Sequence, residues 1–162
     1  MKKIFILLGI PLLAAGCAAQ STTQSSHPVQ LYNYSHQLQV GSQILNVEIA
    51  NTQAEQEQGL SGRSSMQANQ GMLFDFGNSV STTPAFWMKD MNFNLDFIWI
   101  NKNKIVGITP NVPRPVNCKS ADANCLPLYY PPSPANQVLE VNAGWAEKNN
   151  INVGDNIELI SK

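Results

Sequence analysis

The order of apolar and polar residues divides the chain into three parts. An apolar run covers residues 4–15, a stretch rich in Ser, Gln, Thr and Asn covers residues 18–35, and short apolar runs fill the remainder. Many of the short runs alternate apolar with polar residues or are rich in aromatic and β-branched residues. They are bounded by Gly, Asn or Pro, which is typical of β-strands. We therefore predict a β-rich folded domain over residues 37–162.

This pattern predicts eight short strands and two short helices. Thr52 and Glu55 have the spacing of a capping box, which marks the start of the first helix. The expected strands cover about residues 37–40, 44–50, 71–76, 85–89, 95–101, 105–109, 137–141 and 156–160, and the expected helices cover 52–59 and 143–149. These elements favour a mainly β fold, either a single compact β-sandwich or a partly closed barrel.

Residues 1–16 have the layout of a secretory signal peptide. Lys2 and Lys3 precede an apolar run that is shorter than the roughly 20 residues of a spanning helix. The run ends at Leu13-Ala14-Ala15-Gly16-Cys17, which resembles the cleavage site of bacterial lipoproteins. We predict cleavage before Cys17, lipidation of Cys17 and a flexible tether over residues 17–36. The alternative is a plain signal peptide with a coincidental cysteine.

The predicted lipid sets the location of the protein. Acyl chains on Cys17 would hold it on the cell envelope, with the membrane as the partner of its N-terminus. Because Ala18 rather than Asp follows the cysteine, we expect the periplasmic face of the outer membrane if the host is Gram-negative.

Charge and cysteine count narrow the chemistry further. The chain has 10 Lys and Arg and 11 Asp and Glu, so the loss of Lys2 and Lys3 leaves a net charge of −3. A mildly acidic protein without a basic cluster is not expected to bind nucleic acid. Apart from Cys17, the cysteines are Cys118 and Cys125, and we predict a disulfide between them. A metal site is the competing interpretation, but the spacing matches no zinc pattern. We predict no metal and no cofactor.

Two aromatic runs carry the candidate chemistry. We expect the run that ends at Lys89 to form a hairpin with the run that begins near Asp96, so that these two residues lie opposite each other. One face of the hairpin is then apolar, and the other places Trp87 beside the charged pair. Two interpretations stay open: a half-exposed ion pair, or a cleft with Trp87 as its wall and Lys89, Asp96 and Arg63 as polar contacts.

Several motifs in a fixed order resemble the DUF192 family of prokaryotic proteins. The resemblance covers about residues 40–160, and the motifs are Gly59-Leu60 with Arg63, Gly71-Met72-Leu73-Phe74 with Phe76, Phe86-Trp87-Met88-Lys89, Asp96 with Ile98, Leu139-Glu140, Ala143-Gly144 and Gly154-Asp155. The resemblance implies a compact β-rich fold without an established activity. It also implies that Arg63, Trp87, Met88, Lys89 and Asp96 belong to the shared surface or core.

The chain departs from the family pattern in two places. Gln56-Glu57-Gln58 stands where many members have an Arg shortly after the helix start, which argues against an anion-binding role for the helix. A Pro-rich insertion over residues 109–135 holds both remaining cysteines, and it suggests a lid specific to this lineage.

These observations lead us to expect a lipid-anchored, non-catalytic binding module for a small molecule, a glycan or a partner segment, with Arg63, Trp87, Lys89 and Asp96 as binding residues. One alternative is an envelope enzyme of unknown reaction that uses Lys89 and Asp96 as an acid–base pair. Another is a scaffolding lipoprotein. Serine or cysteine hydrolase chemistry is not expected, because both histidines precede the predicted core.

Overall fold

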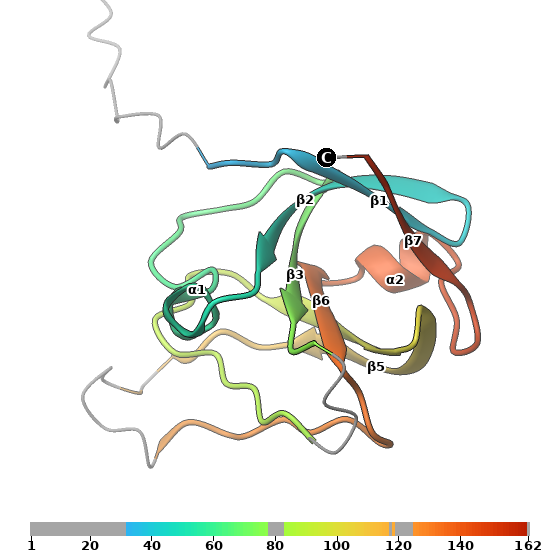
Figure 1. Cartoon of the computed structure of the whole chain (residues 1–162). Helices are drawn as coiled ribbons and strands as arrows, with labels where there is room; N and C mark the ends of the chain where they lie inside the picture. Colours follow the sequence, from blue (N-terminus) through green and yellow to red (C-terminus); the bar gives the residue numbers. More distant parts are fainter. Residues whose placement is uncertain (1–31, 78–82, 117, 119–124, 162) are drawn as a thin grey trace, which may run out of the picture. The chain divides into compact units, whose positions relative to one another are not determined.

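A computed structural model describes residues 32–77, 83–116, 118 and 125–161. Within these residues, one curled sheet of seven strands is accompanied by two short helices (Figure 1). The strands are β1 His36–Val40, β2 Gln43–Ala50, β3 Gln70–Asp75, β4 Leu95–Asn101, β5 Lys104–Val112, β6 Gln137–Asn142 and β7 Ile157–Ser161, and the helices are α1 Gln53–Gln58 and α2 Trp145–Lys148. The predicted mainly β fold is confirmed, in the form of a partly closed barrel.

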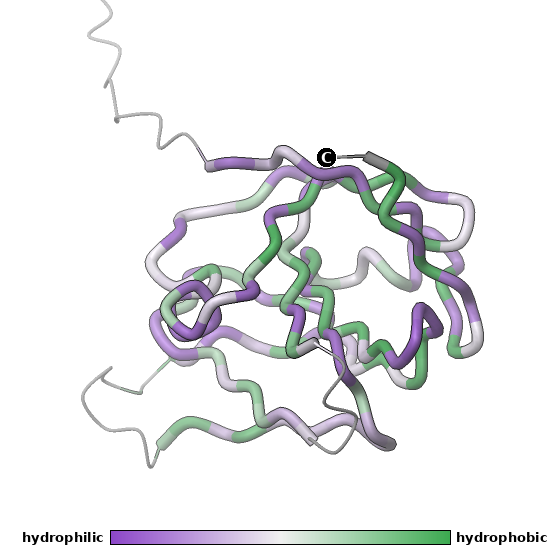
Figure 2. The backbone as a smooth tube through the Cα atoms, viewed as in Figure 1, coloured by the Kyte–Doolittle hydropathy of each residue, from purple (hydrophilic) through white to green (hydrophobic). Residues whose placement is uncertain are grey.

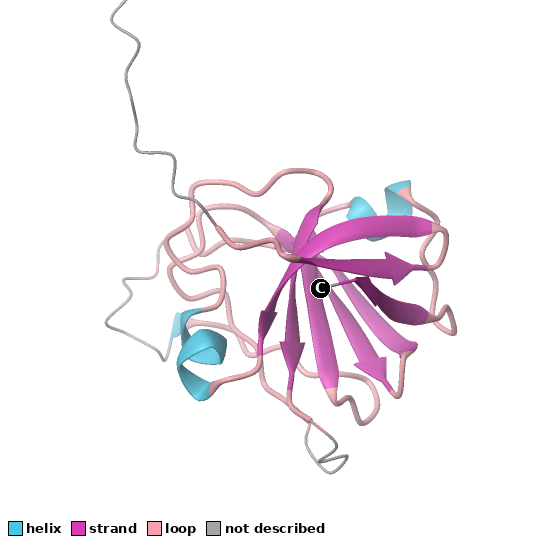
Figure 3. Cartoon of the chain, turned by 45° about the horizontal axis from the view of Figure 1, so that its top comes forward, coloured by secondary structure: helices cyan, strands magenta, loops and turns pink. Residues whose placement is uncertain are grey.

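The strand order in the sheet is β5-β4-β6-β3-β2-β1-β7, and Figure 3 shows how the strands fan out and curl. Neighbouring strands are antiparallel except β2 and β3, which are parallel and joined by the crossover that contains α1. The two outer strands meet at one end. Lys104 forms a β-bridge with Asn156, and the amide of Ile105 donates to the carbonyl of Asp155 over 2.9 Å. Backbone hydrogen bonds therefore close the barrel at this end.

The middle strands of the sheet are buried on both faces. Because successive side chains of a strand point to opposite faces, Ile98 and Ile100 of β4 belong to one buried cluster, while Phe97 and Trp99 belong to another. The first cluster takes side chains from all seven strands and from α2, so it fills the inside of the curl. The second lies on the outer face, which loops cover. Figure 2 shows the apolar stretches along the strands and the polar character of α1.

The predicted strand over residues 85–89 is wrong. This segment makes a single β-bridge, between Phe86 and Tyr129, and it does not pair with β4. Both edges of β4 are occupied, one by β5 and the other by β6. Lys89 therefore does not lie opposite Asp96, and the predicted hairpin is not formed.

The Pro-rich insertion starts later than predicted, because β5 continues to Val112. Beyond it, Cys118 and Cys125 stand at disulfide distance, with their Cα atoms 5.8 Å apart. The predicted signal peptide, Cys17 and most of the predicted tether lie outside the described residues. No helix in the described part of the chain has the length and apolar character needed to cross a membrane.

Candidate functional site

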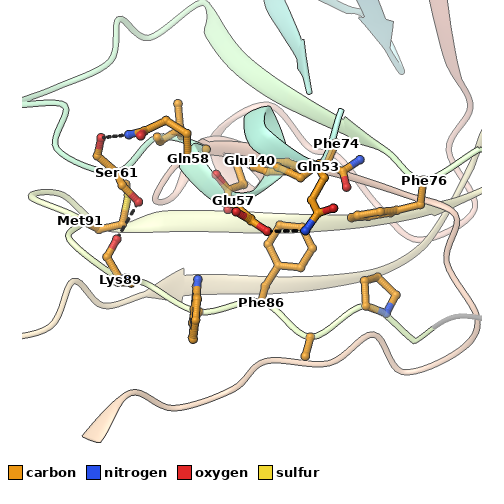
Figure 4. Close-up of a pocket in the computed structure, with 16 residues that line it drawn as sticks. Gln53, Glu57, Gln58, Ser61, Phe74, Phe76, Phe86, Lys89, Met91 and Glu140 are labelled. Carbon is orange, nitrogen blue, oxygen red and sulfur yellow. Dashed lines mark hydrogen bonds between the residues drawn. The ribbon is translucent and has the colours of Figure 1, made fainter. Parts of the chain in front are cut away.

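A pocket of about 250 Å³ lies between α1, the end of β3 and the segment that precedes β4 (Figure 4). We call it the α1 pocket. Its lining combines aromatic and other apolar side chains with charged and amide side chains. The lining residues are Gln53, Gln56, Glu57, Gln58, Gly59, Leu60, Ser61, Phe74, Phe76, Pro84, Ala85, Phe86, Trp87, Lys89, Met91 and Glu140.

Local sequence fixes the helix that forms one wall of this pocket. The predicted capping box is confirmed: Thr52 Oγ1 accepts from the amide of Glu55 over 3.3 Å, and Glu55 Oε2 accepts from the amide of Thr52 over 3.0 Å. These hydrogen bonds lower the pKa of Glu55. Gln56 Nε2 donates to the carbonyl oxygens of Ala50 and Asp75, at 3.3 and 2.9 Å. The helix is thereby held against the ends of β2 and β3.

Phe86 stands at the centre of the aromatic walls. Its ring packs edge to face against Phe74 and Phe76, with centroid distances of 5.0 and 6.1 Å, and against Trp99 at 5.7 Å. Its amide donates to the carbonyl of Tyr129 over 2.9 Å, and the amide of Tyr129 donates back over 2.8 Å. The segment 125–135 therefore holds Phe86 in place from outside.

Glu140 is the buried acid of the pocket. It lies on β6 on the outer face of the sheet, opposite Met72 of β3 and Phe97 of β4. Only 5% of Glu140 is exposed, and no group in the described part of the chain donates a hydrogen bond to its carboxyl. The carboxyl lines the pocket, so its unused hydrogen-bonding capacity is available there.

Burial sets the protonation state of this acid. Loss of hydration raises the pKa of Glu140 to about 8, although the positive charge of Arg63 opposes the rise. At neutral pH the carboxyl is therefore mainly protonated, and it carries one O–H donor and one free acceptor oxygen. A neutral acid at the end of an aromatic cavity can bind either a hydrogen-bond acceptor or, after losing its proton, a cation.

Two of the four predicted binding residues line the α1 pocket. The predicted alternation is confirmed, because Phe86 and Met88 are buried while Trp87 is 44% exposed and Lys89 is half-buried. Lys89 Nζ lies 5.8 Å from the centroid of the Trp87 ring, within the range of a cation–π contact. Ser61 Oγ donates to the carbonyl of Lys89 over 2.9 Å and connects this segment to the end of α1.

Arg63 does not line the α1 pocket. Its guanidinium donates to both carboxylate oxygens of Glu48, at 2.5 and 2.9 Å, and it also donates to the hydroxyl of Tyr34 at 3.2 Å. The ring of Tyr32 stacks on it at 3.7 Å. Arg63 and Glu48 border a separate cavity on the β1 side of α1. The last residues of the predicted tether thus pack on a paired arginine.

Asp96 does not line the pocket either, and the predicted pair with Lys89 is wrong. The carboxylate is fully buried and accepts hydrogen bonds from the backbone amides of Asn111, Gly144 and Ala146, at 2.9, 3.0 and 3.0 Å. These three donors come from β5 and from the start of α2. Asp96 therefore joins three parts of the chain and does not face a cleft.

The sequence alone does not place Glu140, Phe74 and Phe76 in one site. A signal for Glu140 was available, because it is the one charged residue in the apolar run Val138–Val141. A charged residue inside a strand that is buried on both faces is uncommon without a partner or a function. The contribution of Phe74 and Phe76 depends on where α1 packs, which the pattern of strands does not indicate.

Comparison with known proteins agrees with this architecture. A protein from Sinorhizobium meliloti 1021, described as a candidate transcription regulator, is 27% identical with a TM-score of 0.66, over 77% of this chain and 93% of that chain. A protein of unknown function from Novosphingobium aromaticivorans DSM 12444 is 26% identical with a TM-score of 0.66, over 93% of this chain and 99% of that chain. No curated protein matches the chain.

Residues 36–159 match the DUF192 family, which is described as "Uncharacterized ACR". The match spans β1 to β7 and includes the complete α1 pocket. The chain therefore belongs to the DUF192 family.

Proposed function

We propose that this protein is a lipid-anchored envelope protein whose domain is a non-catalytic binding module for a small, ring-bearing molecule. The observation that carries the proposal is the carboxyl of Glu140, which is mostly buried, has no hydrogen-bond partner among the described residues and belongs to the lining of an aromatic cavity. The Glu140 oxygens are not sealed from solvent, so a ligand in the pocket can reach them and take the place of water. Binding sites for small molecules combine apolar walls with a few such polar groups.

The size and walls of the cavity support a small ligand with a ring. Its volume of about 250 Å³ is below the roughly 300–1,000 Å³ of typical ligand pockets. Phe74, Phe76, Phe86 and Trp87 present aromatic surfaces, against which a flat apolar body packs favourably. A single ring with one polar substituent matches this combination of walls and polar group.

The polar groups of the pocket favour binding over catalysis. The hydroxyl of Ser61 donates to a backbone carbonyl, so it has no base beside it to make it a nucleophile. Glu57 accepts a hydrogen bond from Gln53, and Asp96 is held by backbone amides away from the pocket. The acid–base pair that the enzyme alternative requires is therefore not assembled around this cavity.

Mass spectrometry of molecules that co-purify with the full-length protein tests the binding function. We expect a small ring-bearing compound to be enriched with the wild type and depleted with Trp87→Ala, which removes an exposed wall of the pocket. Tyr130→Ala is the matched control, because Tyr130 is also an exposed aromatic residue but does not line the pocket. Equal enrichment with both variants, or no enrichment with the wild type, would count against the proposal.

The anchor has its own test, since Cys17 lies outside the described residues. With Cys17→Ser, we expect the protein to leave the detergent phase on phase partitioning, because the acylated residue is gone. A neighbouring change, Ala18→Ser, should leave partitioning unaltered. Detergent partitioning that survives Cys17→Ser would remove the lipid from the proposal without affecting the pocket.

A further inference from the structure

We propose that the α1 pocket takes a small organic cation, in which an ammonium or amidinium nitrogen bonds to the Glu140 carboxylate and an apolar body packs on the aromatic walls. This inference rests on the proposed binding function and names the class of its ligand. It follows from the hydrogen-bonding groups that the lining has left unused, from its charges and from its aromatic rings.

Several side-chain donors of the lining are already used within the protein. Three glutamine amides and one serine hydroxyl each donate to another protein group, at distances of 2.7–3.3 Å. These donors belong to Gln53, Gln56, Gln58 and Ser61. The carboxyl of Glu140 and one oxygen of Glu57 have no donor in the described part of the chain. Lys89 is a further donor of the lining, so the buried acceptor without a partner in the described part of the chain is the ionised carboxylate of Glu140, and a complementary ligand supplies N–H donors to it.

The charges of the lining also favour a cationic ligand. The charged residues of the lining are Glu57, Glu140 and Lys89, which lies half-buried over Trp87, so the formal charge of the lining is −1 once Glu140 has lost its proton. Arg63 is the cation whose charge acts on Glu140, and it is already paired with Glu48 through both carboxylate oxygens. A ligand cation beside Glu140 would stabilise the ionised carboxylate, so binding at neutral pH releases a proton.

The aromatic rings suit a cation better than a neutral hydrogen-bond acceptor. The faces of aromatic rings attract cations within about 6 Å of the ring centroid, and Lys89 already occupies such a position over Trp87 at 5.8 Å. A neutral acceptor would form one ordinary hydrogen bond with protonated Glu140. A cation gains a charge-assisted hydrogen bond, which is roughly twice as strong as a neutral one.

The test uses three probes of one size on the full-length protein: benzylamine, benzyl alcohol and benzoate. Methionine methyl NMR reports the site, because Met91 lines the α1 pocket and Met66 does not. We expect benzylamine to shift the Met91 methyl signal, with at least about tenfold tighter binding than benzyl alcohol, and to leave Met66 unmoved. Calorimetry at pH 7 in two buffers of different ionisation enthalpy should detect the release of a proton.

Two substitutions of pocket residues should change affinity in opposite directions. Glu140→Gln keeps the shape of the protonated acid but has no negative charge, so it should abolish both the preference for benzylamine and the proton release. Lys89→Met removes the competing cation and should tighten benzylamine binding several-fold. An unchanged methyl spectrum of the free variants shows that the domain is folded.

The possible outcomes separate the binding function of the pocket from the cationic class of its ligand. If benzyl alcohol or benzoate shifts Met91 and binds as tightly as benzylamine, the proposed ligand class is wrong, but the pocket still binds small molecules. Weaker benzylamine binding by Lys89→Met, or binding of benzylamine without proton release, would also contradict a cationic ligand. If no probe shifts Met91, the proposed binding function fails together with the inference.

Discussion

At the residue scale, two buried carboxyls on neighbouring strands have opposite environments. Asp96 on β4 faces the inside of the curl and accepts three backbone hydrogen bonds. Glu140 on β6 faces the outer side of the sheet and accepts none from the described residues. The first carboxyl is satisfied by the fold and holds it together. The second is not satisfied by the fold, which is why it marks the candidate site.

Glu140 should make the stability of the protein fall as pH rises. Its pKa is about 8 in the folded state and 4.5 in its ordinary state, so between these values the folded protein holds a proton that the unfolded chain releases. Its contribution to stability is complete below pH 4.5 and is lost at about 1.4 kcal/mol per pH unit up to pH 8. Urea unfolding at pH 5 and pH 7 should therefore show a loss of a few kcal/mol that Glu140→Gln does not show. Equal pH dependence of the two proteins would contradict the buried, protonated acid.

Asp96→Asn should destabilise the domain by about 2–4 kcal/mol, because an amide has one acceptor oxygen where the carboxylate serves three N–H donors. Asp75→Asn is the control: Asp75 is half-buried and accepts one bond, from the amide of Gly77, so its loss should cost less than about 1 kcal/mol.

A double-mutant cycle between Asp96 and Lys89 should give a coupling energy near zero. Denaturant unfolding measures all of these, and strong Lys89 coupling would restore the pair that the sequence suggested.

The residue-scale predictions from sequence succeeded where the next few residues determine the outcome. The alternation of strand-like side chains predicts that Phe86 and Met88 share one face and that Trp87 lies on the other, and the structure buries the first two and leaves Trp87 exposed. The surroundings of Asp96 and Glu140 depend on strands and loops that lie far away in the sequence. No local pattern indicates which amides will reach Asp96 or which rings will surround Glu140.

At the scale of elements, residues 85–89 have the sequence pattern of a strand although they lie over the sheet and not within it. Its alternating side chains pack into the aromatic cluster on the outer face, so it has the two-residue period of a strand without being in the ladder. A strand has only two edges, and β5 and β6 occupy both edges of β4. The aromatic pattern predicts an apolar face on this segment, but it does not distinguish a partner beside β4 from a cover above it.

Gly107 on β5 should not tolerate a side chain, because the covering segment 125–135 packs directly on the sheet at this position. A Cβ atom there would overlap the ring of Pro132, and it would lie 3.3 Å from Trp99. Overpacking of this kind costs about 1–3 kcal/mol, so Gly107→Ala should lower the free energy of unfolding by about that amount. The double variant with Pro132→Ala should be less destabilised than the sum of the two single changes. Strict additivity would mean that the segment 125–135 does not press on β5.

At the scale of the whole molecule, nearby pairings could be predicted and distant ones could not. The strands predicted over residues 37–40 and 44–50 are β1 and β2, and they pair as a hairpin, with Val40 opposite Gln43 and Gly41 at a φ of 56° in the turn between them. The central order β4-β6-β3 joins segments that are more than twenty residues apart. The sequence of an apolar strand does not indicate which other strand it pairs with. The α1 pocket forms across these distant segments, so the sequence could indicate some of its members but not their assembly.

The predicted disulfide ties down the covering segment, and its removal tests how much that cover contributes. Cys118 and Cys125 are 7 positions apart, and the second begins the segment whose Tyr129 holds Phe86 over the aromatic cluster. Chain entropy gives about 2–3 kcal/mol for closing so short a loop. We therefore expect Cys118→Ala with Cys125→Ala to lower the free energy of unfolding by up to that amount, and reductant to do the same to the wild type but not to the double variant. Alkylation of the unfolded, non-reduced wild type should leave both cysteines unmodified. If both react, or if reductant leaves the stability of the wild type unchanged, the bond does not contribute and the segment 125–135 is held by its other contacts, among them the Phe86–Tyr129 hydrogen bonds and the hydrogen bond from Asn101 Nδ2 to the carbonyl of Pro134.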